Sequence, residues 1–342
     1  MYIVLWIAVS AVALIAAGVL YQLLGSRRDR LRYALQGRSV KIGSRSSLYL
    51  LEQGLGEPTV LFEAGIGATN LNWSHIQEAV AEFTGTVSYD RGGLGWSSRC
   101  RTARTPGNIV AELHEMLEQA GLKPPYILVG HSFGGLVMRR YALFYPEEVA
   151  GVVLVDPMRC EEWPPLNPGR QSQLDLGRRL IGYAVPIAGC GLVRLALTSL
   201  LCRSGKVSNQ LAGPAGTNGR HVLSRVTTEV RKMPRRVWPV VAAHWSRPGY
   251  YVGMRKHIES IPETVREMIL AEPIREIPIT VLTPGNAAPL SDEHLERIGD
   301  CVRQVVALKS EHWIHLDEPG LVIESIREMV SAAASERVAV AK

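Results

Sequence analysis

The segment that most constrains the fold is a pentapeptide, Gly130-His131-Ser132-Phe133-Gly134, set between an apolar run and a helical pattern. The run at 126–129 predicts a buried strand, and the spacing over 133–145 predicts a helix. A sharp strand-to-helix turn needs small residues two before and two after its tip, because the two chains pass closely there. Such a turn would lift the Ser132 hydroxyl above the sheet. The pentapeptide alone also suits an ordinary Gly-rich turn, so that alternative stays open.

Strand and helix patterns alternate on both sides of this turn. A hairpin is predicted over 41–51, strands at 59–62, 86–89, 126–129, 152–155, 277–282 and 302–308, and helices at 73–83, 105–120, 133–145, 292–298 and 321–330. Continuous apolar strands separated by helices predict an α/β protein with a mostly parallel twisted sheet covered on both faces.

The alternation fails over residues 157–275, and a structureless loop of that length is implausible inside a compact domain. We therefore expect a helical cap over 157–275, inserted between the two parts of the core at 38–156 and 276–334. Residues 335–342 are expected to form a flexible tail. The stretch 180–202 holds one charged side chain, Arg194, and several glycines. It favours a pair of cap helices that face an apolar pocket or rest on a membrane surface, although a second span stays open.

The N-terminal segment has the character of a membrane span. The first 26 residues carry no charged side chain, and residues 2–24 are long enough as a helix to cross a hydrocarbon core of about 30 Å. A cleaved signal would begin with basic residues and have a shorter apolar run. We expect a retained transmembrane helix over 1–25, followed by a basic linker over 26–37.

The positive charge is concentrated beside this span. Residues 27–45 hold seven basic side chains and one acidic one, Asp29, an excess that equals the net charge of +6 for the whole protein. The excess of basic side chains therefore indicates a segment that flanks a membrane, and it argues against a nucleic-acid partner. By the positive-inside rule, the catalytic domain is expected in the cytoplasm. Five widely spaced cysteines fit a reduced compartment.

If Ser132 is a nucleophile, its attack on a carbonyl creates an oxyanion that needs fixed N–H donors. One candidate is the N–H of Phe133, at the start of the predicted helix. The second is the N–H of Ile66, because the glycines at 65 and 67 allow close approach after the strand at 59–62. A plain β-turn is the alternative for this loop.

The base is expected to be a histidine, since imidazole can accept the serine proton and return it near neutral pH. His312 directly follows the last predicted strand and precedes a helix, so it lies at the edge of the sheet where the serine turn also lies. His315 is its rival. His131, His75 and His114 are expected to have other roles, because they lie beside the serine or on predicted helices.

Several motifs together resemble the α/β-hydrolase-fold serine hydrolases of the esterase and lipase type, in a membrane-anchored form. They are LFEAGIG at 61–67, YDRGGLGWS at 89–97, VGHSFGG at 129–135, VLVDP at 153–157 and HWIHLDEP at 312–319. The resemblance spans the core and excludes the cap. It implies the fold, the serine turn, both oxyanion donors, the place of His312, and a structural role for Asp90.

The resemblance leaves the acid of a Ser-His-acid triad open. In most relatives the acid follows the seventh strand of the sheet, and here that position is Ala288. Some members of the fold use the end of the preceding strand, which offers Asp156. Asp156 is our preferred acid, Asp292 is the alternative, and a Ser–His pair without an acid stays open.

These features predict a serine hydrolase that cleaves an ester or related acyl bond of a lipophilic small molecule through an acyl-enzyme on Ser132. We expect no cofactor and no metal, and the partners are the acyl substrate and the membrane. An acyltransferase or a cofactor-free haloperoxidase-like activity could use the same residues. A non-catalytic, membrane-anchored binding protein is the alternative from another class of function. It is favoured by Ala288, which stands where most relatives have the triad acid.

Overall fold

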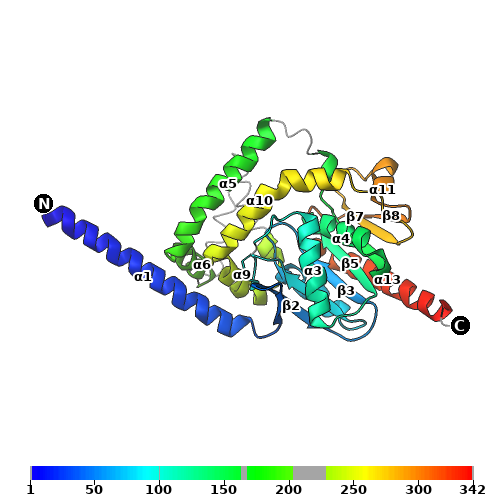
Figure 1. Cartoon of the computed structure of the whole chain (residues 1–342), viewed down its shortest axis with the longest axis horizontal. Helices are drawn as coiled ribbons and strands as arrows, with labels where there is room; N and C mark the ends of the chain where they lie inside the picture. Colours follow the sequence, from blue (N-terminus) through cyan, green and yellow to red (C-terminus); the bar gives the residue numbers. More distant parts are fainter. Residues whose placement is uncertain (1, 100, 163–167, 203–228, 341–342) are drawn as a thin grey trace.

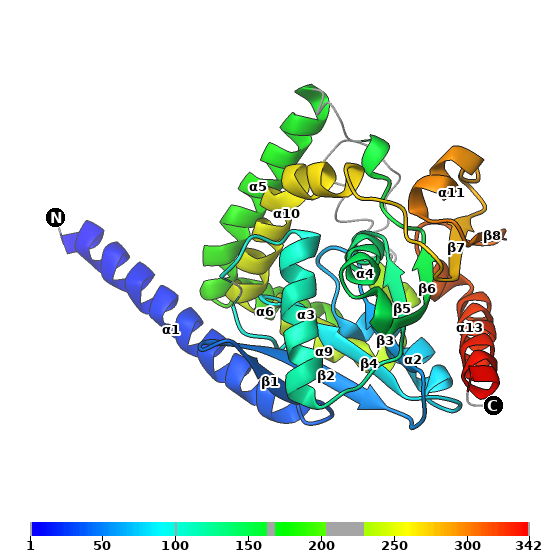
Figure 2. The same ribbon diagram turned by 45° about the vertical axis from the view of Figure 1, so that its right-hand side comes forward.

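The computed structural model describes residues 2–99, 101–162, 168–202 and 229–340, and its core is one eight-stranded sheet (Figures 1 and 2). The strands are β1 (Arg38–Ile42), β2 (Ser46–Gln53), β3 (Thr59–Glu63), β4 (Thr86–Asp90), β5 (Tyr126–His131), β6 (Val149–Val155), β7 (Ile279–Pro284) and β8 (Val302–Ala307). Their spatial order is β1-β2-β4-β3-β5-β6-β7-β8. β2 pairs antiparallel with β1 and β4, and every later pair is parallel. The predicted hairpin and mostly parallel sheet are confirmed.

Helices cover both faces of the sheet, which is why its strands are apolar throughout. α3 (Pro106–Ala120) and α4 (Phe133–Phe144) share one buried cluster with Leu128 of β5. α2 (Ser74–Val80) and α13 (Pro319–Val340) share the other cluster with Ile127 and Val129. Neighbouring residues of a strand point to opposite faces, so each central strand must be apolar at every position.

The described part of the predicted cap is helical. Its elements are η3 (Cys160–Glu162), α5 (Pro168–Gly189), α6 (Leu192–Cys202), η4 (Arg235–Val237), α9 (Trp238–Trp245) and α10 (Pro248–Ile269). α5 and α10 lie side by side above the carboxyl ends of the strands (Figure 1). Residues 163–167 and 203–228 of the predicted cap lie outside the described residues.

Short elements complete the core and bring the loops to the sheet edge. They are η1 (Asn70–Trp73), η2 (Pro146–Glu148), α11 (Asp292–Ile298) and α12 (Ile314–Asp317). Where a flexible tail was expected from residue 335, α13 continues through Val340. Its Ala-rich end has high helix propensity, which the prediction did not weigh. Cys160, Cys190 and Cys301 are free thiols, and Cys100 lies outside the described residues.

The N-terminal helix α1 (Tyr2–Tyr33) projects beyond the body in both views (Figures 1 and 2). Within the described residues it is the one single helix long and apolar enough to cross a membrane, and the bent pair α5–α6 also passes that test if counted as one span. Where a basic linker was expected from residue 26, the helix continues through Tyr33. Its C-terminal part contacts the cap, since Gln22 donates to the Ser246 carbonyl at 2.8 Å.

Candidate active site

Ser132 occupies a strained turn at the tip of β5. Its backbone has φ 53° and ψ −119°, a region that non-glycine residues rarely occupy. Three backbone hydrogen bonds hold this conformation. The Ser132 N–H donates to Val155 at 3.0 Å, and the Ser132 carbonyl accepts from Gly135 at 3.0 Å and from Met158 at 3.1 Å. The turn is thus fixed between β6 and the first turn of α4.

The two glycines that flank Ser132 are required by close backbone contacts. A Cβ atom at Gly130 would lie 2.5 Å from the carbonyl oxygen of Gly134, and one at Gly134 would lie 2.5 Å from that of Glu63. No real Cβ tolerates such distances, so a larger residue would displace the turn. This is the physical reason for the spacing seen in the sequence.

His312 and Asp156 meet at the carboxyl edge of the sheet. His312 Nδ1 lies 2.6 Å from Asp156 Oδ2, and because a carboxylate only accepts, Nδ1 is the donor. His312 Nε2 is therefore left as the acceptor that a base needs. Asp156 directly follows β6 with a positive φ of 41°, and its N–H donates to the Leu282 carbonyl at 2.8 Å. The contacts among the described residues include no hydrogen bond between Ser132 and His312, a bond that is often loose without substrate.

The other candidate histidines are placed differently. His315 is fully buried against Trp73, and His131 is buried with its Nε2 donating to the His312 carbonyl at 2.9 Å. Burial is the largest cause that holds the pKa of both rings well below the ordinary value. Both are therefore weak bases, whereas His312 has a carboxylate partner.

None of the described contacts places the other two candidate positions for the acid, 288 and 292, next to His312. Asp292 is exposed in the first turn of α11, whose N-cap is Ser291. Ala288 is exposed in the loop after β7, and its carbonyl accepts from Arg159 at 3.3 Å. Of the three positions considered from the sequence, the structure brings Asp156 to the imidazole.

The loop after β3 places Ile66 beside the serine. A Cβ atom at Gly65 would lie 3.7 Å from Ser132 Cβ, so this backbone passes directly along the serine side chain. The buried Arg91 donates from its guanidinium to the Gly65 carbonyl. In a trans peptide the N–H points opposite to the carbonyl, so the Ile66 N–H is directed away from Arg91. Among the described residues this N–H and that of Phe133, the first residue of α4, have no hydrogen-bond partner.

A buried charge network fixes this loop, and its role was not predicted from the sequence. Arg91 Nε lies 3.3 Å from Glu63 Oε1, and Tyr89 donates to the same carboxylate. Burial raises the pKa of the Glu63 carboxyl, while Arg91 and the Tyr89 hydrogen bond lower it. The available signal was a charged residue at the end of each of two neighbouring buried strands, β3 and β4.

A pocket adjoins the Ile66 loop under the cap. Its lining mixes apolar and polar side chains and comprises Ile66, Gly67, Ala68, Thr69, Asn72, Glu229, Val230, Met233, Val241, His244, Trp245, Tyr250 and Met254. Asn72 donates to the buried Glu229 carboxylate. Burial raises the pKa of Glu229 to about 7, against the lowering effects of the Asn72 hydrogen bond and of His312. Glu229 therefore lies close enough to His312 for their charges to interact.

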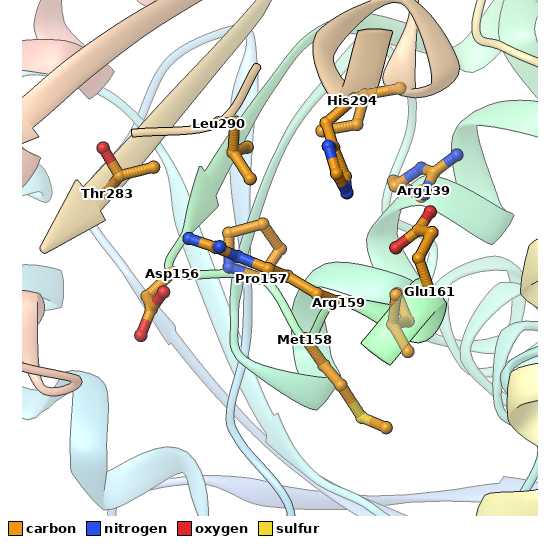
Figure 3. A pocket seen from close by; sticks show the side chains of 11 residues that line it. Arg139, Asp156, Pro157, Met158, Arg159, Glu161, Thr283, Leu290 and His294 are labelled. Atoms are coloured by element: carbon orange, nitrogen blue, oxygen red, sulfur yellow. The ribbon is translucent and has the colours of Figure 1, made fainter. Parts of the chain in front are cut away.

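A second pocket lies behind Asp156 (Figure 3). Asp156 stands at one edge, and Arg139, Glu161 and His294 gather at the opposite one. β7 contributes Thr283 and the loop after it contributes Leu290, so the described lining supplies no acid from this part of the chain. Across the described residues, no group of three or more His, Cys, Asp or Glu side chains could hold a metal ion.

Comparisons with known proteins agree with this architecture. A family model described as alpha/beta hydrolase fold matches residues 58–186. The uncharacterized protein YqjL of Bacillus subtilis is 35% identical over 105 residues, which cover 31% of this chain and 42% of that protein. The chain thus matches less than half of that relative's length.

Two solved structures are similar over most of both chains. An esterase from Thermogutta terrifontis has a TM-score of 0.58 and 20% identity, covering 87% of this chain and 99% of its own. The epoxide hydrolase CorEH has a TM-score of 0.62 and 14% identity, covering 86% of this chain and 98% of its own. At these identities the likeness concerns the fold alone. Together with the family match and the sheet order, it shows that this chain has the alpha/beta hydrolase fold.

Proposed function

We propose that the chain is a serine hydrolase that cleaves an ester or related acyl bond through an acyl-enzyme on Ser132. The observation that carries this proposal is the 2.6 Å hydrogen bond between His312 Nδ1 and Asp156 at the sheet edge that also holds the strained Ser132. Such a bond orients the imidazole and leaves Nε2 to accept a proton.

The proposed chemistry runs in two halves. His312 Nε2 accepts the Ser132 proton as Oγ attacks the substrate carbonyl, and the N–H groups of Ile66 and Phe133 stabilise the oxyanion. The bond to the leaving alkoxide breaks, and His312 returns the proton to it. Water then attacks the acyl-serine by the same route, releasing the acid and restoring Ser132.

The substrate is proposed to be a lipophilic small molecule. Val230, Met233, Val241 and Met254 line the pocket beside the Ile66 loop, where an acyl chain would contact apolar side chains. Epoxide hydrolases of this fold attack with an aspartate, so the serine at position 132 disfavours that reaction. The proposal requires no cofactor.

The rival function is a non-catalytic binding protein with the same fold. Labelling with a fluorophosphonate probe, which reacts with an activated serine, separates the two functions. We expect the full chain in detergent to be labelled and Ser132→Ala to be unlabelled. Ser310→Ala is a matched control. The Ser310 hydroxyl is hydrogen-bonded to Glu318, so its removal should not affect labelling. Absence of labelling in folded wild type would favour the binding protein.

We further propose that α1 spans a membrane and that the catalytic domain faces the cytoplasm. Support comes from the apolar length of α1 and from the arginines at its C-terminal end, Arg27, Arg28, Arg30 and Arg32. A protease added to sealed inside-out vesicles should digest the domain, and the same protease added to intact cells should not. The reverse pattern contradicts the orientation.

A further inference from the structure

A separate pocket lies where the C-terminal part of α1 meets the core and the cap. α1 contributes Leu23, Ser26 and Arg30. The loop after β4 and the start of α10 contribute Gly93, Gly95, Ser97, Ser98, Arg99, Arg247, Pro248, Gly249 and Tyr250. The pocket therefore joins the proposed span to the folded domain. Its lining includes neither Asp156 nor His312, and it shares Tyr250 with the pocket beside the Ile66 loop.

Three arginines surround this pocket. Arg247 is half-buried, donates to the Gly95 carbonyl and lies over the Trp96 ring at 5.5 Å, so its guanidinium is held in place. Arg30 and Arg99 are exposed. The ion pairs of the described residues include none with Arg30, Arg99 or Arg247. The pocket thus concentrates positive charge that none of the described ion pairs neutralises.

The charged groups around Arg247 act on its pKa in both directions. Arg30 and Arg99 both act to lower the pKa of Arg247, after burial as the largest cause, whereas Asp90 acts to raise it. The Asp90 carboxylate is already engaged by the backbone N–H groups of Asn70 at 3.0 Å and Trp96 at 2.9 Å. An added anion would therefore relieve repulsion among the three guanidinium groups.

The position of the pocket along α1 indicates where such an anion would come from. Leu23 belongs to the uncharged stretch that ends at Ser26, and Arg30 lies one helical turn beyond it. In a membrane-spanning helix this is the depth of the lipid headgroups. Guanidinium and serine hydroxyl groups are suitable donors to phosphate oxygens.

We propose that this pocket binds the phosphate group of an anionic membrane phospholipid, held by Arg30, Arg99 and Arg247. The inference rests on the proposed membrane placement of α1 and is independent of the proposed hydrolysis. A bound lipid would link the span to the catalytic domain at a fixed position.

The test uses the full chain in an uncharged detergent, titrated with dihexanoyl phosphatidylglycerol and followed by tryptophan fluorescence. The test variant is Arg30→Gln with Arg99→Gln, two exposed positions that need not disturb the fold. The matched control is Arg28→Gln with Arg45→Gln, which removes the same charge at exposed sites outside the pocket. Dihexanoyl phosphatidylcholine and inorganic phosphate are titrated in parallel.

We expect the test variant to bind phosphatidylglycerol about tenfold more weakly than wild type, and the control to stay within about twofold. An equal loss of phosphatidylglycerol affinity in both variants would mean that binding is diffuse charge attraction. Absence of binding by wild type would mean that there is no site. Either result overturns the proposal. Equal affinity for phosphatidylcholine overturns the anionic preference, and equal affinity for inorganic phosphate overturns the lipid as the source. Fluorophosphonate labelling of Ser132 in the same samples separates a failure here from a failure of the proposed hydrolysis.

Discussion

At the scale of single residues, the triad that we propose takes its acid from the end of β6, and not from the loop after β7. β6 and β7 are neighbours with parallel pairing, so the carboxyl ends of both reach the same side of the sheet. Asp156, at the end of β6, can therefore contact the imidazole even though Ala288 offers no carboxylate after β7. Its positive φ of 41° turns the chain sharply at that point.

Asp156→Asn should lower kcat for a soluble ester by about 10⁴-fold, as found when a triad acid loses its charge. The amide can donate toward His312 Nδ1 and so favours the wrong tautomer. Asp292→Asn is the matched control, because it alters an exposed carboxylate at the start of α11. If turnover instead collapses with Asp292→Asn and survives with Asp156→Asn, the acid is assigned wrongly.

Glu229 gives a second prediction at this scale, concerning stability and pH. Its pKa is raised from 4.5 to about 7, so between these values the folded state binds more protons than the unfolded state. Its contribution therefore favours folding at low pH and is lost as pH rises through about 7. The change is at most about 3–4 kcal/mol, at about 1.4 kcal/mol per pKa unit.

Glu229→Gln keeps the acceptor for Asn72 and removes this titration. The difference in Tm between the variant and wild type should therefore be more positive at pH 8 than at pH 5, as measured by differential scanning fluorimetry. Glu259→Gln, an exposed pair with Arg255 on α10, should show the same difference at both pH values. A flat difference for Glu229→Gln would mean that Glu229 titrates normally.

At the scale of elements, the loop after β3 is held by contacts with Arg91, which directly follows the neighbouring strand β4. Arg91 at the end of β4 contacts both the Gly65 carbonyl and the Glu63 carboxylate, and so fixes the peptide that carries the Ile66 N–H. A lysine has one ammonium group in place of the guanidinium fork and cannot reproduce both contacts at once. The loop would then lose its orientation toward Ser132.

Arg91→Lys should lower kcat by about 10²-fold and leave KM little changed, as expected when one oxyanion donor is misplaced. Tm should fall too, since Glu63 loses a buried partner, so kcat is measured per folded molecule. Arg140→Lys is a control for the substitution itself, because Arg140 pairs with Glu267 away from the loop. A fall in Tm with unchanged kcat would assign Arg91 a purely structural role.

The elements of the core could be predicted from the sequence, and parts of the site could not. Strand and helix periods follow from local burial, and the Gly130 and Gly134 spacing follows from backbone contacts within one turn. Which carboxylate contacts the imidazole depends on which strands are neighbours, so the sequence could favour Asp156 but had to leave Asp292 open. Arg91 and Glu229 were missed because their roles depend on contacts with residues distant in sequence, Gly65 and Asn72.

At the scale of the whole molecule, α1 is joined to the cap by polar groups. Arg194, the one charged side chain in the apolar stretch 180–202, donates to Gln22 Oε1 at 2.9 Å and to Ser26 Oγ at 3.2 Å, and pairs with Asp29. A Cβ atom at Gly18 would lie 2.3 Å from the Cys190 carbonyl, so the backbones also approach closely. The cap is thereby anchored to the proposed span.

Arg194→Gln should reduce the stability of the full chain in detergent by about 3 kcal/mol, because Asp29 loses its ion-pair partner and Gln22 Oε1 loses its donor at a largely buried site. The measurement is Tm, converted with the unfolding enthalpy. Arg255→Gln, which removes an exposed ion pair with Glu259, should change stability by less than about 1 kcal/mol. Gln22→Ala combined with Arg194→Gln should cost less than the sum of the two single changes, since both remove the same contact. Additive losses would mean that the two side chains act separately, and the contact would then not be what holds α1 to the cap.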